Sequence, residues 1–547
     1  MNKRYTFRAG LVFLFFCFLY LAIACNLYLI QIKQRDFFNN LAQQQYTLSI
    51  TTHPPRALIL DRVGVPLTIN KESISAFIEP SKITNIAPLE RFLKKEFPQS
   101  LERLKAHRDA QFLFIKRKLS PEQRTAIEQN EQADIQFMKE PHRWYPMESM
   151  GHIIGITDID NHGLFGIESM FNNRLAGLPS TFALQKDARS GTYYFAKKTT
   201  KEGHEGEPVK LTIDSTLQFL AYEDLKDTVN AYNAREGAVL VLNPKTGEII
   251  VMAQYPNFDP NNTQEVAMEL TKNRAVTESY ELGSVMKAFT ALAALEEQVV
   301  TADEMIDCRN MKVGYFDGFK ISTWKAHDML SFSEVIELSN NFGVADIGKR
   351  LGPKLYEHYK RLGFGQKTAL NWPGEQAGFV NPPSSWSRQS IISLSFGYEL
   401  SATLLQLALS FCMIANNGIP VIPSIIAYPQ QHIAQPTDPI YRPDTIATIR
   451  GILERTVSQG TAHRGKIKGY KVMGKTGTAN MVVDGKYDTK RNTYTFAGIL
   501  EKGDYQRVIV TFIREVPNPH SMLYASSVAV PLFEKVAEHV ILHDRVL

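Results

Sequence analysis

The sequence predicts an α+β fold that follows a single membrane-spanning helix, and three observations support this prediction. Residues 11–32 form one long apolar run. Two strand patterns flank a turn within residues 237–253, and two more strands are predicted within residues 494–512. The pattern between residues 284 and 417 is mainly helical. Strands first, helices next and strands again predict an antiparallel sheet with helices packed on it.

Length and composition are those of a globular protein with more than one domain. The 547 residues exceed one typical domain, and the hydrophobic content of 44% and charged content of 21% are those of folded proteins. The formal net charge is only +5, and no dense run of lysine and arginine indicates a nucleic-acid partner. A mild basic surplus suits an anionic membrane surface, although such a surplus usually serves solubility alone.

The four cysteines do not indicate a metal site. Cys17 and Cys25 fall in the apolar run, and no pair has the CxxC spacing that is typical of zinc ligands. Cys308 and Cys412 can form one disulfide or remain two thiols. We expect free buried thiols.

The N-terminus predicts a membrane anchor. Residues 11–32 are long enough to cross a bilayer as a helix. Lys3, Arg4 and Arg8 precede the run, which predicts a cytoplasmic tail of residues 1–10 and an external remainder. No second long apolar run follows, so a single-pass protein is expected.

Two alternative interpretations involve cleavage. Ala22-Ile23-Ala24 resembles a signal-peptidase site, and Ala24-Cys25 resembles a lipoprotein site. The apolar run continues past both through Leu27-Tyr28-Leu29-Ile30, which favours an uncleaved anchor. All three interpretations put the rest of the chain outside the cytoplasm.

The region before about residue 207 predicts short elements separated by loops. A polar juxtamembrane helix is expected over residues 33–46, and Pro54-Pro55-Arg56 ends it. A strand that runs into a turn follows at residues 58–67, and helical patterns with charged surfaces occupy residues 80–140. Loops or linkers are expected at residues 143–146, 163–168 and 199–207.

The later elements follow in order. After a strand at residues 209–214 and a helix at residues 215–230, the hairpin turns at Asn243-Pro244-Lys245-Thr246-Gly247. Strands at residues 494–500 and 506–512 precede a terminal amphipathic helix over residues 526–543.

Three motifs in this order carry chemistry. Ser284-Val285-Met286-Lys287 opens an apolar helical run, where a serine and a lysine three residues apart share one face. Such a lysine can activate the serine as a nucleophile without a histidine. Ser339-Asn340-Asn341 follows, and Lys475-Thr476-Gly477 with Thr478 comes last. Penicillin-binding proteins and β-lactamases carry such an ordered set.

Two further matches in the chain are expected to be structural. Ser322-Thr323-Trp324-Lys325 repeats the serine–lysine spacing, but its flanks do not predict a helix start. Lys245-Thr246-Gly247 repeats the lysine–threonine–glycine motif, but it precedes the serine helix and lies in the predicted hairpin turn. By contrast, Ser339-Asn340-Asn341 is the only serine–x–asparagine in the chain.

The residue types suit acyl transfer. Lys287 can take the proton of Ser284 only when it is neutral, and burial together with the nearby positive charge of Lys475 would lower its pKa. Ser339 is expected to pass a proton to the leaving amine. Asn341 is expected to orient Lys287 or the substrate amide, since its side chain both donates and accepts.

The remaining candidates bind the substrate. Gly283 allows a tight turn before Ser284, and the helix start there offers donors to an oxyanion, together with the amide of Thr478. The hydroxyls of Thr476 and Thr478 suit a substrate carboxylate. Gly477 allows close backbone approach.

With these motifs the chain resembles a class B penicillin-binding protein, a membrane-anchored peptidoglycan D,D-transpeptidase, over nearly its whole length. Residues 395–403 look most like the division-specific FtsI type. Departures from the family pattern are Ala57, Leu282, Trp372 and Glu399, and none is a catalytic position. Other marks of the resemblance are residues 56–64, 143–146, 166–168, 273–275, 372–375 and 460–462.

The resemblance implies an activity, partners and a location. Ser284 would attack the penultimate D-Ala carbonyl of a stem pentapeptide, and an amine of a neighbouring peptide would resolve the acyl-enzyme into a cross-link. β-Lactams would acylate Ser284, and no metal or organic cofactor is implied. A polytopic glycosyltransferase of the FtsW type and other division proteins are the implied partners at the bacterial inner membrane. The domains would be a non-catalytic pedestal at residues 33–207 and a periplasmic transpeptidase domain at residues 208–547.

Other functions stay open at this stage. A D,D-carboxypeptidase or a β-lactamase uses the same acylation but hands the acyl group to water. A non-catalytic β-lactam sensor or division scaffold would predict a defective motif set, whereas all three motifs are intact.

Overall fold

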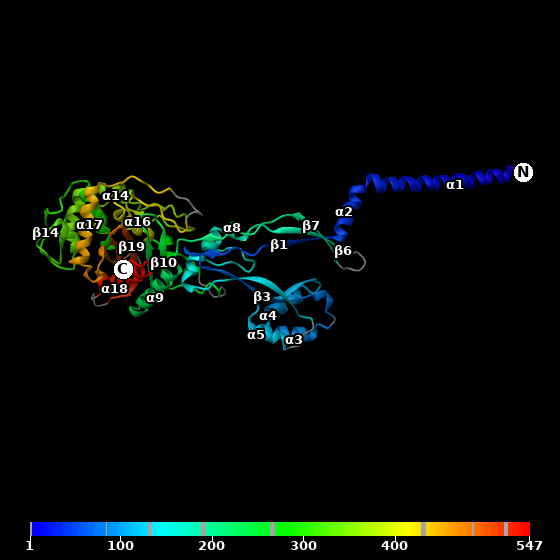
Figure 1. Ribbon diagram of the computed structural model, residues 1–547, viewed down its shortest axis with the longest axis horizontal. Helices are drawn as coiled ribbons and strands as arrows, with labels where there is room; N and C mark the ends of the chain where they lie inside the picture. The colour runs from blue at the N-terminus through cyan, green and yellow to red at the C-terminus, as the bar shows by residue number, and fades with distance from the viewer. Residues whose placement is uncertain are drawn as a thin grey trace. The chain divides into compact units, whose positions relative to one another are not determined.

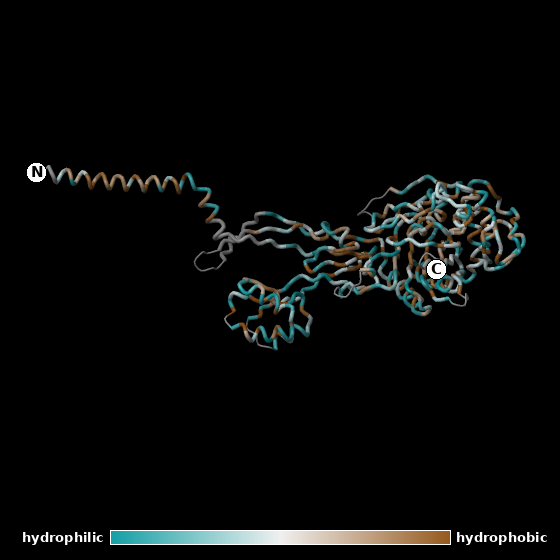
Figure 2. Tube along the Cα trace, turned by 180° about the vertical axis from the view of Figure 1, so that it is seen from behind, coloured by the Kyte–Doolittle hydropathy of each residue, from teal (hydrophilic) through white to brown (hydrophobic). Residues whose placement is uncertain are grey.

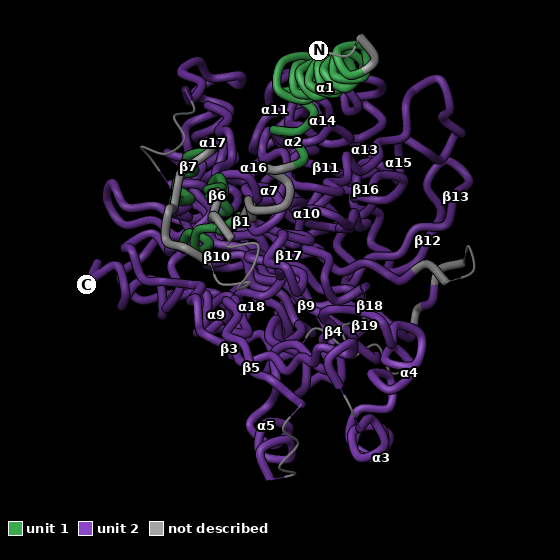
Figure 3. Tube along the Cα trace, turned by 90° about the vertical axis from the view of Figure 1, so that its right-hand side faces the viewer, with its two compact units in different colours: residues 1–57, 176–207 green, residues 58–175, 208–547 purple. Residues whose placement is uncertain are grey.

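This computed structural model describes residues 3–83, 85–129, 134–186, 193–262, 268–427, 434–483, 486–518 and 523–546. The chain divides into two compact units (Figure 3). One comprises residues 1–57 and 176–207, and the other comprises residues 58–175 and 208–547.

The first unit begins with the predicted apolar helix. Helix α1 (Lys3–Tyr28) continues into a π-helical turn, η1 (Leu29–Lys33). Among the described residues it is the one helix long and apolar enough to cross a membrane, over Tyr5–Lys33. Figure 2 shows hydrophobic residues along most of its length. Helix α2 (Arg35–Tyr46) is the predicted juxtamembrane helix.

An antiparallel sheet completes this unit. Its order is β1 (Thr47–Thr52), β6 (Ser180–Lys186) and β7 (Tyr193–Lys201). The predicted linker at residues 199–207 is wrong at its start, because Thr199 pairs with Phe182 and Lys201 with Thr181. These residues form a strand because their backbone pairs with β6, and the polar, glycine-bearing sequence does not reveal this pairing.

The second unit opens with a small sheet covered by helices. The sheet order is β4 (Leu113–Lys116), β3 (Ile69–Ile78) and β5 (Gln136–Trp144), all antiparallel. Helices α3 (Ala87–Glu96), α4 (Pro98–Ala106) and α5 (Pro121–Glu128) confirm the helical patterns. The unexpected strands β4 and β5 lie within or overlap the region predicted as helical. Sheet and helices share a core that includes Leu89, Phe92, Leu93, Leu101, Leu104, Ile115 and Ile127.

The predicted loop marks at residues 143–146 and 163–168 are partly wrong. Arg143 and Trp144 end β5, where Arg143 pairs with Asn70 of β3. Residues 166–168 begin α7 (Gly166–Met170). Arg143 Nε donates to Glu168 Oε1 at 2.8 Å, and their side chains are 1% and 0% exposed. A buried ion pair therefore ties β5 to α7.

Loss of this ion pair is expected to destabilise the second unit. Arg143→Ala removes the guanidinium that pairs with the buried Glu168 carboxylate, and loss of one member of a buried ion pair typically costs about 3–5 kcal/mol. Lys139→Ala on the same strand is the matched control, because its pair with Glu72 is exposed on both sides. Thermal unfolding of the detergent-solubilised chain should show a large decrease in Tm for Arg143→Ala and not for Lys139→Ala. Equal decreases would contradict the prediction.

Two short strands join the early residues of this unit to its main domain. β2 (Ile59–Leu60) pairs in parallel with β8 (Val209–Lys210), so the predicted strands at residues 58–67 and 209–214 are present but shorter. Asp61 Oδ1 accepts from the amides of Val63 and Val65, which closes the predicted turn.

The main sheet is five-stranded and antiparallel, as predicted. Its order is β10 (Ile249–Tyr255), β9 (Glu236–Leu242), β19 (Tyr505–Pro517), β18 (Lys486–Lys502) and β17 (Lys471–Val483). Strands β9 and β10 are the predicted hairpin. Strand β9 is buried along its whole length, so both faces of the sheet are covered.

Helices surround this sheet (Figure 1). Helices α9 (Ser215–Ala231) and α18 (Ala525–His543), both predicted, pack on it in one apolar cluster with side chains such as Val239. Helix α16 (Leu404–Ala415) contacts β9, β18 and β19, and α17 (Pro443–Ser458) contacts β17.

The middle of the domain is less helical than predicted. Short ribbons interrupt it, pairing β11 (Met305–Asp307) with β14 (Met329–Ser331) and β12 (Val313–Phe316) with β13 (Phe319–Ser322). Strands of three or four residues are too short to show the alternation of apolar and polar residues by which a strand is predicted. Cys308 and Cys412 are free and buried, as expected. The other elements here are α10 (Arg274–Thr277), η5 (Gly283–Met286), α11 (Lys287–Glu296), α12 (Phe332–Glu337), α13 (Asn341–Leu351), α14 (Lys354–Arg361), α15 (Ser390–Ser395), β15 (Phe379–Val380) and β16 (Leu400–Ser401).

Candidate active site

Ser284 lies in the short helical turn η5, directly before α11, as its motif predicts. Gly283 adopts φ +59°, the left-handed conformation that favours glycine. The turn packs on β17, because a β-carbon built at Gly477 would lie 2.5 Å from the carbonyl oxygen of Leu282. Close packing through Gly477 thus holds Ser284 beside the lysine–threonine–glycine strand. The side chain of Ser284 itself is half-buried.

Lys287 is the first residue of α11 and is fully buried. Its Nζ donates to Ser339 O at 2.7 Å, to Ser339 Oγ at 3.1 Å and to Asn341 Oδ1. Asn341, the first residue of α13, also donates from Nδ2 to the carbonyl oxygen of Ser322 at 2.5 Å. Asn341 therefore orients the amine of Lys287, which is one of the two roles that the sequence left open for this asparagine.

Ser339 connects the two motif lysines. It lies between α12 and α13 with φ +56°, a conformation that brings its hydroxyl and its carbonyl to the same amine. Lys475 Nζ, from strand β17, donates to Ser339 Oγ at 3.0 Å and to Thr476 O at 3.2 Å. One hydroxyl oxygen is therefore within hydrogen-bond distance of both amines.

Both lysines have lowered pKa values. Burial, followed by the positive charge of Lys475, holds the pKa of Lys287 well below its usual 10.5. Burial alone lowers the pKa of Lys475 to about 7. Two ammonium groups around one hydroxyl repel each other, so protonation of one opposes protonation of the other. This arrangement favours one neutral amine, which can accept a proton, and one cation.

The two repeated motifs have the local structure that the sequence predicts, because neither one begins a helix. Ser322 ends strand β13 and Lys325 follows in a bend, and both side chains are exposed. Lys245-Thr246-Gly247 lies in the turn between β9 and β10, where Gly247 N donates to Asn243 O at 2.9 Å.

Sequence reasoning assigned no role to two residues next to the motifs. Thr461 Oγ1 lies 3.2 Å from Thr476 Oγ1. Trp324 Nε1 donates to Leu338 O at 2.6 Å, directly before Ser339. The only sequence signal for Thr461 was its place in Gly460-Thr461-Ala462. Trp324 lay within the second serine–lysine match, so that segment supports the site although it does not supply the nucleophile.

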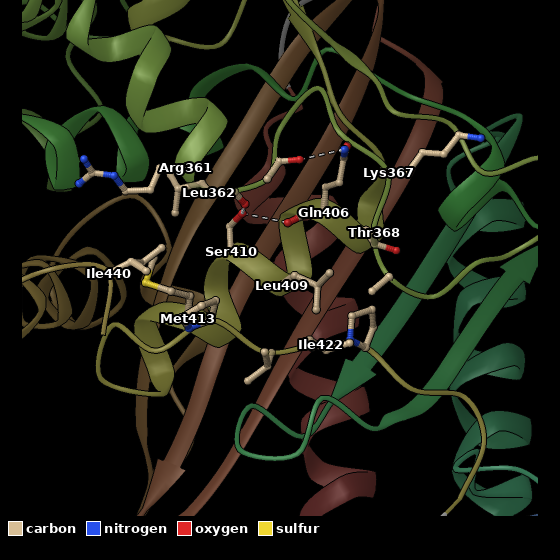
Figure 4. Close-up of a pocket in the computed structure, with 15 residues that line it drawn as sticks. Arg361, Leu362, Lys367, Thr368, Gln406, Leu409, Ser410, Met413, Ile422 and Ile440 are labelled. Carbon is tan, nitrogen blue, oxygen red and sulfur yellow. Dashed lines mark hydrogen bonds between the residues drawn. The ribbon is translucent and has the colours of Figure 1, made fainter. Parts of the chain in front are cut away.

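A cavity elsewhere in the domain does not include the motif residues. It measures about 220 Å³, and the residues that line it include Leu409 and Met413 of α16 together with Arg361 and Lys367 (Figure 4). Within the described part of the chain, no group of three or more His, Cys, Asp or Glu side chains is placed to hold a metal ion.

The turn before Ser284 should not tolerate a side chain at Gly283. In Gly283→Ala the new β-carbon would lie 2.7 Å from the carbonyl oxygen of Thr478, so Ser284 must shift relative to β17. Acylation by a penicillin is expected to fall by at least about tenfold, since small displacements of reacting groups are costly. Gly503→Ala is the control, because Gly503 has a similar φ of +56° but open space around its β-carbon position. Similar rates for both variants would contradict the prediction.

Comparisons with known proteins identify two family domains in the chain. Residues 237–538 match the penicillin binding protein transpeptidase domain, and residues 51–211 match the penicillin-binding protein dimerisation domain. The chain is 30% identical over 526 residues to "Probable peptidoglycan D,D-transpeptidase PbpC" of Pseudomonas aeruginosa, covering 94% of this chain and 91% of that protein. It is 27% identical over 518 residues to "Peptidoglycan D,D-transpeptidase FtsI" of Escherichia coli, covering 92% and 84%.

A solved structure shows the same fold over most of the chain. Penicillin binding protein 3 from Mycobacterium tuberculosis, complexed with aztreonam, matches with a TM-score of 0.69 and 25% identity. The match covers 91% of this chain and 98% of that one. With the transpeptidase match over more than half of its length and the dimerisation match before it, the chain belongs to the class B penicillin-binding proteins.

Proposed function

We propose that this protein is a peptidoglycan D,D-transpeptidase that cross-links stem peptides through an acyl-enzyme on Ser284, at the division septum. The observation that carries the proposal is the position of the Ser339 hydroxyl between the amines of Lys287 and Lys475, beside the Ser284 turn. Relatives named peptidoglycan D,D-transpeptidase support it, and the FtsI relatives support the septal role.

Acylation begins with proton transfer from Ser284 to the neutral amine of Lys287. Ser284 Oγ forms a bond to the penultimate D-Ala carbonyl carbon as the peptide C–N bond breaks. Ser339 gives its proton to the leaving D-Ala amine and takes one from Lys287 in return, along their hydrogen bond. Lys287 is then neutral again, ready to accept a proton from the incoming amine.

The proposed binding groups surround this proton path. Lys475 supplies positive charge, and the hydroxyls of Thr476 and Thr478 bind the terminal carboxylate of the donor peptide. The amides of Ser284 and Thr478 stabilise the oxyanion. Close packing of Gly477 against the Ser284 turn supports an oxyanion site formed by both amides. Asn341 holds the amine of Lys287 in place.

A penicillin carries a reactive amide carbonyl and a carboxylate that correspond to those of the donor peptide, and it would acylate the same serine. A penicillin-binding protein 3 that is similar to this chain was solved with aztreonam and another time with ampicillin. Binding of β-lactams is therefore part of the proposal.

The proposed architecture follows the sequence. Residues 1–10 form a cytoplasmic tail and residues 11–32 the anchor in the inner membrane, with the rest of the chain periplasmic. Residues 33–207 form the pedestal and residues 208–547 the transpeptidase domain. An FtsW-type glycosyltransferase and other division proteins engage the anchor and the pedestal.

The molecule that accepts the acyl group from Ser284 distinguishes a transpeptidase from a hydrolase. The detergent-solubilised chain, incubated with lipid-linked peptidoglycan precursor and a glycosyltransferase of the FtsW type, is expected to yield cross-linked stem peptides and one D-Ala for each. Release of D-Ala without cross-links would support a D,D-carboxypeptidase instead. A chain that is acylated by neither penicillin nor precursor would support a non-catalytic scaffold.

A further inference from the structure

A threonine outside the three motifs lies where two of them meet. Thr461 follows α17 in the chain and is half-buried. Its amide donates to the carbonyl oxygen of Glu337 at 3.3 Å, and its Oγ1 lies 3.4 Å from the same oxygen. Glu337 ends α12, two residues before Ser339. Thr461 therefore connects the Ser339 segment to α17.

The same hydroxyl reaches the strand that carries Lys475. Thr461 Oγ1 lies 3.2 Å from Thr476 Oγ1, and either oxygen can donate. The Glu337 carboxylate pairs with Arg455 of α17, which is a second contact between the end of α12 and this helix. Thr461 thus contacts both the segment before Ser339 and the strand of Lys475.

We propose that Thr461 is a positioning residue for recognition of the substrate carboxylate, acting through the hydroxyl of Thr476. This inference rests on the proposed function, in which Thr476 donates a hydrogen bond to the terminal carboxylate. A hydroxyl has one proton and two acceptor positions. When the proton of Thr476 points at the carboxylate, its oxygen accepts from Thr461.

Two acceptors compete for the proton of Thr461. They are Glu337 O at 3.4 Å and Thr476 Oγ1 at 3.2 Å. When a carboxylate binds, the proton of Thr461 turns to Thr476 and the proton of Thr476 turns to the anion. Each hydrogen bond in such a chain polarises the next, so the anion is held more strongly than by Thr476 alone. A ligand without the negative charge is stabilised much less by this chain of hydrogen bonds.

The test compares a penicillin with its methyl ester, which keeps the reactive ring but lacks the charge. The second-order rate of acylation of the detergent-solubilised full chain is measured with both. Thr461→Val, which is nearly isosteric, is expected to slow acylation by the acid about three- to tenfold and to leave the ester rate unchanged. Thr461→Ser keeps the hydroxyl and is expected to retain the wild-type ratio of acid rate to ester rate.

Controls separate this role from a structural one. Thr448→Val on α17 removes a hydroxyl that donates to Asp444 O of its own helix, and it should change neither rate. Equal loss with acid and ester in Thr461→Val, or no loss with either, would overturn the proposal. A Thr461→Ser variant as slow as Thr461→Val would overturn it as well.

The variant Thr476→Val distinguishes a failure of the role proposed for Thr461 from a failure of the proposed function on which that role rests. If Thr476→Val lowers the ratio of acid rate to ester rate and Thr461→Val does not, only the role of Thr461 fails. If Thr476→Val keeps the wild-type ratio, the assignment of the carboxylate to Thr476 fails, and the inference fails with it.

Discussion

Replacement of Ser284 by alanine is expected to abolish covalent labelling of this protein by fluorescent penicillin. The label requires a bond to an activated oxygen, and the Ser284 turn is the serine-bearing segment packed on the Lys475 strand beside Lys287. Loss of the nucleophile of a serine acyl-transfer enzyme typically lowers the rate at least about 10⁴-fold. Mass spectrometry of the labelled wild-type chain should find the adduct on the peptide that contains Ser284.

The repeated serine–lysine spacing gives the matched control. Ser322→Ala removes the other serine that precedes a lysine by three residues, but that serine ends a strand and is exposed. It is expected to label as the wild type does. An adduct on Ser322, or unchanged labelling of Ser284→Ala at an unchanged Tm, would disprove the assignment of the nucleophile.

Removal of the amine of Lys475 is expected to have the second largest effect. In Lys475→Ala the Ser339 hydroxyl loses one of its two amine partners, and the carboxylate site loses its positive charge. Acylation by a penicillin is expected to fall about 10²–10³-fold, the usual cost of removing a preorganised electrostatic group. Lys471→Ala is the control, because Lys471 lies on the same strand with its side chain exposed. A wild-type rate in Lys475→Ala would contradict the role of this lysine.

The pH dependence of the same variant tests the coupling of the two lysines. The wild type needs a neutral Lys287, so its acylation efficiency falls at low pH, and a charged Lys475, whose pKa of about 7 makes the efficiency fall above neutrality. Without the charge of Lys475, the pKa of Lys287 rises towards its usual value. In Lys475→Ala the acid limb should therefore move to higher pH, and the limb near pH 7 should disappear. An unchanged acid limb would show that the charge of Lys475 does not act on Lys287.

Long and strongly patterned elements were predictable because their residues interact with near neighbours in the chain. Helix α1, the hairpin of β9 and β10, and helix α18 follow directly from apolar runs, turn residues and helical periodicity. The short ribbons between α11 and α12 and the four-residue strand β4 were missed or wrongly predicted, because a few residues show no clear period. The nine-residue strand β5 was missed because its buried residues do not alternate regularly with exposed ones. Their pairing depends on partners elsewhere in the chain.

The sequence by itself determined the three motif segments and their order, and it predicted Ser284 rather than Ser322 as the nucleophile, since these depend on local patterns and spacing. Only the tertiary structure decided that the Ser339 hydroxyl lies between two buried amines, and that Asn341 holds the amine of Lys287. It also brought Thr461 to Thr476. These contacts join segments far apart in the chain, so they arise from the packing of α11, α12, α13 and the loop after α17 around β17. Burial, which lowers the pKa of both lysines, is a property of that packing.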